Sequence, residues 1–290
     1  MENSSVYWSN WAGLSDVTSA MQIQRGLGAS KLAISSVGGT INVVTKTSDL
    51  KEGGSVSSSF GNDNYLKTQG SYNTGVMKNG FSASVLFSRT AGDGYVNGTE
   101  FEGYNYFMAF GYKINNKHSL QFTFTGAPQW HNQRSTSPLL TDYLKFGSNG
   151  VDPNIKYNSD WGYLNGEKFN MTRNFYHKPV GSINWDFNID ETSKLSTVVY
   201  GSWGRGGGAR GAGGVRGLTY TADAFRTEDG LVDFDKIQAY NSGQTVFIDG
   251  ENRTRTEING NFQNSSDSGK KGSGASTVYN TTSGISQISS

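Results

Sequence analysis

The residues best suited to contacting a ligand form a short aromatic and basic segment near the middle of the chain. Trp130, His131 and Arg134 follow a segment that alternates apolar and polar residues, as a strand does. An indole ring can stack on a ligand, and a guanidinium can bind a carboxylate or phosphate through two hydrogen bonds. We therefore name these three as candidate ligand-binding residues. The alternative is structural, with Trp130 as an interfacial aromatic side chain and its neighbours solvated.

Other residue types that support catalysis or metal binding are sparse. The three histidines, His118, His131 and His177, are not joined by a His-x-x-x-His spacing, and the chain has no cysteine. A thiolate metal site, a cysteine nucleophile and a disulfide framework are therefore excluded. No Ser-His-Asp set or carboxylate pair stands at an informative spacing. We expect no enzyme activity, no metal site and no cofactor.

A glycine- and arginine-rich stretch at residues 201–217 superficially resembles segments that bind RNA or phosphate. It lacks the Lys-Ser/Thr ending and the following helix of a phosphate-binding loop. The net charge of the chain is only +1, so bulk electrostatics give no case for nucleic acid. We expect a flexible loop without a nucleic-acid partner, whose basic side chains would help to attract an anionic ligand.

The elements that must position these residues are strands. Only 34% of residues are hydrophobic, and no run approaches the roughly 18 apolar residues of a membrane helix. Frequent glycine and aromatic residues with only 4 prolines suit long hydrogen-bonded ladders. Period-two alternation predicts about seven strands, the clearest with Tyr104, Tyr106, Met108, Phe110 and Tyr112 on one face. Their ranges are 53–60, 65–74, 81–90, 104–113, 119–125, 180–189 and 194–203.

Alternation alone also fits a soluble sandwich, but the connections between the strands favour a membrane barrel. The turns at 75–80, 114–118 and 190–193 are short. The intervening connections at 91–103, at 126–179 and after 204 are long, and only the first, at 61–64, is short. Outer-membrane barrels have tight turns on one rim and long loops on the other. One long connection, residues 231–240, is predicted to hold a short helix.

Residues 23–46 carry a motif that resembles the end of the plug domain of TonB-dependent receptors, in the variant of the Bacteroidota. The family pattern is Arg-Gly after a strand, a stretch of small residues, then Gly-Gly-x-Ile-Asn-x-x-Thr-Lys. Residues 121–134 also resemble barrel sequence of that group. The positions that match the pattern are Arg25, Gly26, Gly38, Gly39, Ile41, Asn42, Thr45 and Lys46.

The resemblance implies a barrel of about 22 strands filled by a plug. It implies energy-coupled uptake of a scarce large solute, such as a ferric siderophore, through the bacterial cell outer membrane. The partners would be outer-membrane lipid, the TonB complex, and a transported metal chelate, vitamin or glycan. This chain shows no signal peptide, no TonB box and only about seven strands, so we interpret it as a fragment of such a receptor.

On this basis the fold class is all-β: a partial transmembrane antiparallel β-barrel with the C-terminal part of an α+β plug domain. Residues 1–48 would end the plug, 49–260 would form barrel strands and outer loops, and 261–290 would be a poorly ordered tail. The plug-motif residues Arg25, Gly26, Gly28, Gly38, Gly39 and Asn42 are candidates for a hinge. Alternatively, the glycines permit tight turns and Arg25 pairs with a barrel carboxylate.

The competing function is a β-rich binding module that does not transport, either in the outer membrane or soluble, such as an adhesin or a carbohydrate-binding domain. An outer-membrane module would close its sheet within these residues and leave 20–46 outside it. A soluble domain would bury its apolar strand faces in one core. Tyr104, Tyr106, Phe110 and Ile183 without protein cover would count against it.

Overall fold

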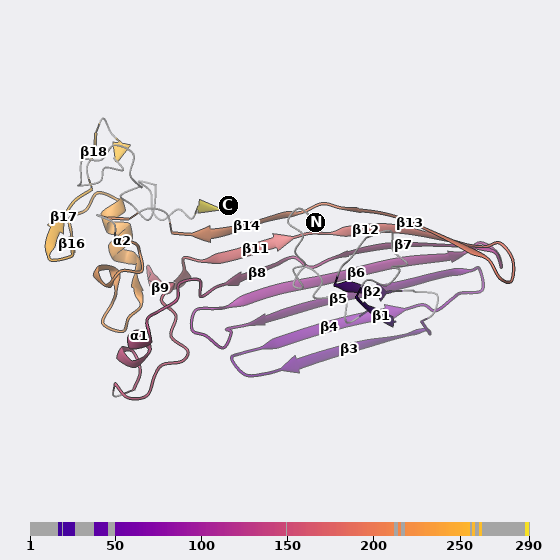
Figure 1. Ribbon diagram of the computed structural model, residues 1–290, viewed down its shortest axis with the longest axis horizontal. Helices are drawn as coiled ribbons and strands as arrows, with labels where there is room; N and C mark the ends of the chain where they lie inside the picture. The colour runs from indigo at the N-terminus through magenta and orange to yellow at the C-terminus, as the bar shows by residue number, and fades with distance from the viewer. Residues whose placement is uncertain are drawn as a thin grey trace.

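The computed structural model describes residues 17–18, 20–26, 38–45, 50–148, 150–211, 214–215, 218–255, 257–258, 261–262 and 288–289. Within them the fold is mainly β and is dominated by one 11-stranded antiparallel sheet. Figure 1 shows long, nearly parallel ribbons, with a group of short elements at one end and tight turns at the other. None of the described helices is long and apolar enough to cross a membrane.

Each main strand pairs with the next main strand along the chain, as in an antiparallel meander. All of the predicted strands are present within the described residues, and several are longer than the alternation alone indicated. They are β3 (Gly53–Phe60), β4 (Leu66–Asn73), β5 (Phe81–Gly92), β6 (Phe101–Lys113), β7 (His118–Gly126), β12 (Val180–Asn188) and β13 (Lys194–Ser202).

Three of these strands continue beyond a short interruption. β7 continues as β8 (Gln129–Asn132), β12 is preceded by β11 (Arg173–His177), and β13 continues as β14 (Arg205–Arg210). The pairing register is unchanged across each break. Pro128 and Pro179 lie in two of the breaks, where each removes one N–H donor from the ladder. The 11 described strands therefore reduce to seven continuous ones, with β20 (Ile288–Ser289) added at the edge of β14.

The expectation of a flexible glycine-rich loop is wrong for residues 205–210. They form β14, which pairs with β11 and includes the register Gly206↔Tyr176. A Cβ on Gly206 would lie only 2.8 Å from the Cβ of Tyr176. Here glycine lets two strands approach each other beside a bulky side chain. Composition alone does not distinguish this role of glycine from that of a flexible loop.

The two faces of the sheet have opposite chemistry. One, the aromatic face, carries apolar side chains that are largely bare: Tyr104 is 47% exposed, Phe110 50% and Ile183 53%. The other, the polar face, carries mainly small and polar side chains, many of them buried, together with Leu86 and Phe107. Those below 9% exposure include Ser82, Ser84, Ser88, Asn105 and Thr123. A sheet folded in water buries its apolar face, so this arrangement is the reverse of the usual one.

A small hairpin lies over the polar face. It consists of β1 (Ala20–Arg25) and β2 (Gly39–Val44), which pair antiparallel (Figure 1). Nε2 of Gln121 in β7 donates a hydrogen bond to the carbonyl oxygen of Thr45, just after β2, at 2.9 Å. Val17 packs on a buried cluster of Leu86, Phe107 and Ala109 on the same face. The N-terminal segment therefore contacts the side of the sheet that is polar.

Described residues from 133–172 and 214–255 build a separate small unit, called here the loop domain, at one end of the sheet (Figure 1). Its core contains Met171, Phe225, Val232, Phe234, Ile237 and Ile248, each below 3% exposure. The helix predicted within 231–240 is confirmed as α2. The elements are α1 (Leu140–Lys145), β9 (Trp161–Leu164), β10 (Glu167–Asn170), η4 (Asp223–Phe225), β15 (Val232–Asp233), α2 (Phe234–Asn241), β16 (Val246–Ile248) and β17 (Glu251–Arg253).

Most of the tail predicted to be poorly ordered, residues 261–290, lies outside the described residues. What is described there is β19 (Asn261–Phe262), which pairs with β18 (Glu257–Ile258), and the edge strand β20.

Candidate functional site

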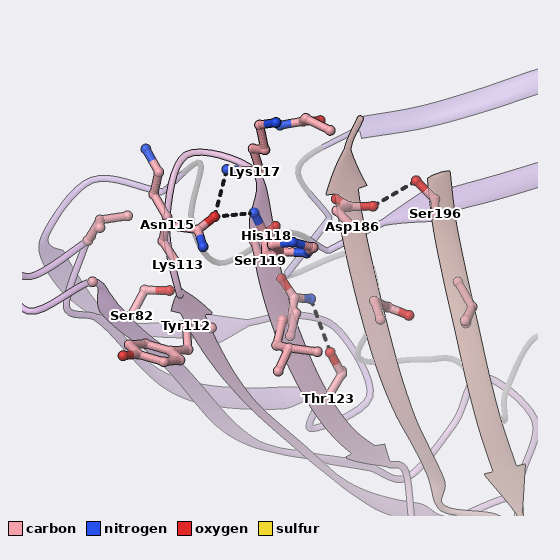
Figure 2. A pocket seen from close by; sticks show the side chains of 18 of the residues that line it. Ser82, Tyr112, Lys113, Asn115, Lys117, His118, Ser119, Thr123, Asp186 and Ser196 are labelled. Atoms are coloured by element: carbon pink, nitrogen blue, oxygen red, sulfur yellow. Dashed lines mark hydrogen bonds between the residues drawn. The ribbon is translucent and has the colours of Figure 1, made fainter. Parts of the chain in front are cut away.

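A hollow of about 900 Å³ lies against the polar face, close to the short turns of the sheet. Val43 and Thr45 line it from the N-terminal hairpin. The opposite wall comes from β5, β6, β7, β12 and β13 (Figure 2). Its polar residues include Ser82, Gln121, Thr123, Ser182, Asn184, Asp186 and Ser196. The hollow thus separates the end of the hairpin from the sheet.

Strand alternation and register bring these side chains together. Ser82 lies opposite Gly111, Gly111 opposite Gln121, and Gln121 opposite Asn184, so one row of the ladder crosses four strands. Paired residues of an antiparallel ladder point to the same face. Residues far apart in sequence therefore form a single polar wall.

One short turn closes the hollow at its rim. Oδ1 of Asn115 accepts hydrogen bonds from the backbone N–H groups of Lys117, at 2.8 Å, and His118, at 2.9 Å (Figure 2). Such an Asx turn reverses the chain within a few residues. The turn places Lys113 and Lys117 on the lining.

The carboxylate in the hollow is already engaged. Asp186 forms an ion pair with Lys194 at 3.0 Å and accepts a hydrogen bond from the hydroxyl of Ser196 at 2.7 Å. Nε2 of Gln121 contacts Thr123 Oγ1 at 3.2 Å as well as Thr45. The wall therefore offers hydroxyl and amide groups that can bind water or a polar solute.

The predicted ligand-binding residues do not share a face. Trp130 pairs with Glu102 on the aromatic face, and its Nε1–H points to Glu102 Oε2 at 3.4 Å. His131 is the next residue of the same strand, so it points to the polar face, where its ring meets Tyr176 edge-on. Burial lowers the pKa of His131, which leaves the imidazole neutral at pH 7. Arg134 is exposed and reaches the carbonyl oxygen of Tyr157 at 3.4 Å. A ligand role for each residue stays a prediction.

Trp130 instead belongs to a polar cluster at the loop-domain end of the aromatic face. Nε of Arg89 lies 2.7 Å from Glu102, and the hydroxyl of Tyr104 donates to the same carboxylate at 2.8 Å. The guanidinium of Arg173 stacks over the Trp130 ring at 4.3 Å. This is the geometry of a cation–π contact and an ion pair at the border of an apolar surface.

The described histidines lie apart from one another. His118 stacks on Phe187 at a ring distance of 4.4 Å, and His177 Nε2 lies 2.8 Å from the hydroxyl of Tyr106. Within the described part of the chain, no group of three or more His, Asp or Glu residues could hold a metal ion.

Most of the plug-motif residues lie in the N-terminal hairpin. Gly26 has φ +74°, and Gly39 has φ +128°, where a Cβ would collide with the carbonyl oxygen of Gln24. Both positions favour glycine, which suits the turn role. Gly38 immediately precedes β2, Arg25 is exposed, and the backbone of Asn42 pairs with Gln22. Gly28 lies outside the described residues. The hinge role stays a prediction.

Sequence reasoning missed a buried polar centre in the loop domain. Asp160 is fully buried and accepts hydrogen bonds from the backbone N–H groups of Ser135 and Thr136, at 2.7 and 2.8 Å. The hydroxyls of Thr136 and Tyr220 also donate to it, each at 2.6 Å. The spacing of apolar residues after residue 214 indicates a core. The sequence around Asp160, however, does not distinguish it from a solvated aspartate in a loop.

No protein-family model and no curated protein matches the chain. Two siderophore receptors are among the solved structures that are similar to the chain. One is the siderophore receptor PiuA from Acinetobacter baumannii, with a TM-score of 0.49 and 14% identity over 67% of this chain and 27% of the receptor. The other is the open form of the ferric-catecholate import receptor Fiu from E. coli K12, with a TM-score of 0.49 and 13% identity over 66% and 29%. The chain therefore spans less than a third of either receptor.

Proposed function

We propose that the chain is part of a TonB-dependent outer-membrane receptor that takes up a scarce large solute, such as a ferric siderophore, with energy from the TonB complex. The observation that carries the proposal is the distribution of side chains on the sheet, which is the reverse of that in a soluble protein. Its aromatic face is bare, while its polar face lies beneath the N-terminal hairpin. Residues 1–48 would then be the end of the plug, and 49–260 barrel strands with outer loops.

The aromatic face has the chemistry and height of a surface in contact with lipid. The charge-free part of β6 runs from Glu102, on the aromatic face, to Lys113, on the polar face, which is 11 residue steps by their numbers. At about 3.3 Å per step and a tilt of about 40°, this spans roughly 28 Å, close to the apolar band of an outer-membrane barrel. A bare apolar sheet of this extent is unfavourable in water and is stable in hydrocarbon.

Aromatic rings mark both borders of that band, where amphipathic rings favour the lipid–water boundary. Near the short turns, Phe81 stacks on Tyr112 at 4.3 Å and His118 on Phe187. At the other border lie Tyr104 and Trp130, beside charged groups. The loop domain stands beyond this second border, which therefore faces the cell exterior in the proposal.

Transport, rather than binding alone, is supported by the contact between the hairpin and the sheet. The hollow lies between the end of the hairpin and the wall, and Nε2 of Gln121 in that wall donates a hydrogen bond to the carbonyl oxygen of Thr45. Polar walls of this kind can exchange protein hydrogen bonds for water at small net cost. A segment held in this way can shift and open a path for the solute.

The non-transporting binding module is less well supported. Within the described residues β3 pairs only with β4, so the sheet is open. The described residues 20–26 and 38–45 lie over its polar face rather than outside it. Tyr104, Phe110 and Ile183 are about half exposed, which argues against a soluble domain, whereas Tyr106 is partly buried. The loop domain would then serve capture of the solute before transport.

The proposal is tested by where the protein resides and by tethering the hairpin. The parent receptor should fractionate with the outer membrane and migrate differently before and after heating. Because the chain has no cysteine, a Thr45→Cys, Gln121→Cys pair can be joined by a short, cleavable thiol cross-linker. Uptake of a candidate ferric siderophore should stop on cross-linking, return on cleavage, and persist in each single variant. Recovery in the soluble fraction, or uptake unchanged by the tether, would contradict the proposal.

A further inference from the structure

An amine and a side-chain amide meet on one carboxylate where the sheet joins the loop domain. The carboxylate belongs to Glu100, which directly precedes β6. Its Oε1 accepts a hydrogen bond from Nζ of Lys168, in β10, at 3.2 Å. Its Oε2 accepts one from Nδ2 of Asn132, at the end of β8, at 3.0 Å. One acceptor group therefore holds a nucleophile and a nitrogen that could leave.

The carbonyl of the same amide is polarised from its other side. Nε of Arg173 donates a hydrogen bond to Oδ1 of Asn132 at 3.0 Å. Since a guanidinium only donates and a carboxylate only accepts, these two partners fix which way the amide faces. Asn132 is only 7% exposed, and Arg173 also stacks over the Trp130 ring at 4.3 Å. A donor in this position would stabilise the negative charge that develops on Oδ1 when the amide carbon is attacked.

The backbone holds these groups in place without help from the ion pair. The N–H of Asn132 donates to the carbonyl oxygen of Glu100 at 2.9 Å. In β10, two residues after Lys168, Nδ2 of Asn170 donates to the carbonyl oxygen of Gly98 at 2.8 Å. The strand that carries the amine is thus fastened to the segment that carries the carboxylate. Groups held together in this way react far more readily than the same groups free in solution.

We propose that Lys168 and Asn132 join in a side-chain amide bond, with Glu100 carrying the protons. Nζ of Lys168 loses a proton to Glu100 and forms a bond to Cγ of Asn132. Two protons of the former ammonium pass to Nδ2, the Cγ–Nδ2 bond breaks, and that nitrogen leaves as ammonium. Glu100 ends as the carboxylate that it was at the start, so the reaction needs no oxidant, water or second reactant.

The ionisation of the amine makes this reaction slow. The Lys168 side chain is half exposed, and its pKa is raised, first by the hydrogen bond to Glu100 and further by the nearby Asp93 and Tyr163. At neutral pH the neutral, nucleophilic amine is therefore a minor form. The carboxylate that favours the ammonium is also the group that can take its proton. A slow reaction is sufficient, because the bond has to form only once in each molecule.

The bond would tie the wall of the sheet to the loop domain. It joins β8 to β10 and closes a loop over residues 132–168, in a chain that has no cysteine. A cross-link of this kind restricts the unfolded chain in the way that a disulfide does. This inference goes beyond solute uptake and does not rest on the proposed function.

The test measures the intact mass of the purified full chain after incubation for days at growth temperature. The wild-type chain should become lighter by about 17 Da, the mass of ammonia. Tryptic digestion should give one branched peptide that contains residues 132 and 168, without cleavage after Lys168. Lys168→Arg keeps the positive charge beside Glu100 but has no nucleophilic amine, so it should keep its full mass. Glu100→Gln, which removes the proton carrier, should keep it as well.

The matched control is Lys156→Arg, since Lys156 forms a similar ion pair with Asp63, at 2.8 Å, outside this cluster. It should lose ammonia as the wild type does. As a second readout, a protease cut within 133–167 should leave two fragments that stay joined in denaturant in the wild type and separate in Lys168→Arg.

Two results would overturn the proposal. One is a wild-type chain of unchanged mass after incubation, with fragments that separate in denaturant. The other is a loss of ammonia that persists in Lys168→Arg, which would assign it to ring closure at an Asn-Gly pair such as Asn165-Gly166. Either result leaves the proposed uptake untouched.

Discussion

Asp160 shows how one side chain can organise an irregular region. The loop domain has few regular elements, so its polar backbone groups need partners other than a ladder. Asp160 satisfies two backbone N–H groups and two hydroxyls while fully buried. Removing it would leave these donors buried without partners, which costs more than the loss of a surface ion pair.

We predict that Asp160→Ala destabilises the loop domain by about 3 kcal/mol, because several buried donors lose their acceptor. Tyr220→Phe, which removes a single donor to the same carboxylate, should cost only about 1 kcal/mol. Limited proteolysis of the full chain would measure both, as the rate of cleavage within 133–172. Equal cleavage rates for Asp160→Ala and the wild type would show that the network does not hold the loops.

Two buried tyrosines give the loop domain a dependence on alkaline pH. Burial raises the pKa of Tyr157 and of Tyr220 above the ordinary value of 10.0. The folded state therefore favours the protonated phenols, and their contribution to stability is complete below about pH 10 and is lost as the pH rises above it. Cleavage within 133–172 should accelerate above that pH, together with tyrosinate absorbance. A Tyr157→Phe, Tyr220→Phe chain that shows the same acceleration would contradict this assignment.

At the scale of elements, the strands were predictable and the loop domain was not. In 81–90 and 104–113 the residue type alternates with the face of the sheet to which each side chain points. This alternation is a local property of each strand, so it can be recognised in the sequence. The predicted strand before Pro128 ended too early and the one after Pro179 began too late, because a missing N–H interrupts the pattern without ending the register. The hollow on the polar face is lined by a row of residues from four strands. The register between strands that are far apart in sequence cannot be predicted from the sequence of any one strand.

The core of the loop domain depends on α2. Asp233 caps this helix by accepting a hydrogen bond from the N–H of Lys236 at 2.9 Å, and Phe234 is fully buried against Phe169, with the rings 4.7 Å apart. The segment places apolar residues at positions 234, 237 and 240, on one side of a short helix. That local spacing is why the helix could be predicted while its partners from 161–171 could not.

Phe234→Ala should destabilise the loop domain by about 4 kcal/mol, because a large buried ring is replaced by a cavity. Phe247→Ala is the matched control, since Phe247 lies in the same domain and is 60% exposed. Hydrogen exchange followed by peptide mass would report rapid exchange of 161–171 and 223–248 in Phe234→Ala alone, with β5 and β6 still protected. Loss of protection in β5 and β6 as well would mean that the loop domain and the sheet unfold as one unit.

At the scale of the whole molecule, one sheet would separate two environments in the proposed receptor. Its aromatic face would contact hydrocarbon, and its polar face would contact water and the N-terminal hairpin. Period-two alternation of residue types suits both faces at once, because successive side chains of a strand point to opposite faces of the sheet. The loop domain and the short turns lie at opposite ends, which gives the sheet an outer and an inner rim in the proposed receptor (Figure 1).

The most direct measurement of this account is a spin-label scan along β6 in lipid bilayers. The chain has no cysteine, so single cysteines from position 104 to 113 each carry one label. Collisions with oxygen, which dissolves in hydrocarbon, should be frequent at positions 104, 106, 108, 110 and 112. Collisions with a water-soluble nickel complex should not peak there, and the oxygen signal should fall at each position between them. A scan without this alternation, or with the aromatic positions shielded from oxygen, would contradict the placement of this face in lipid.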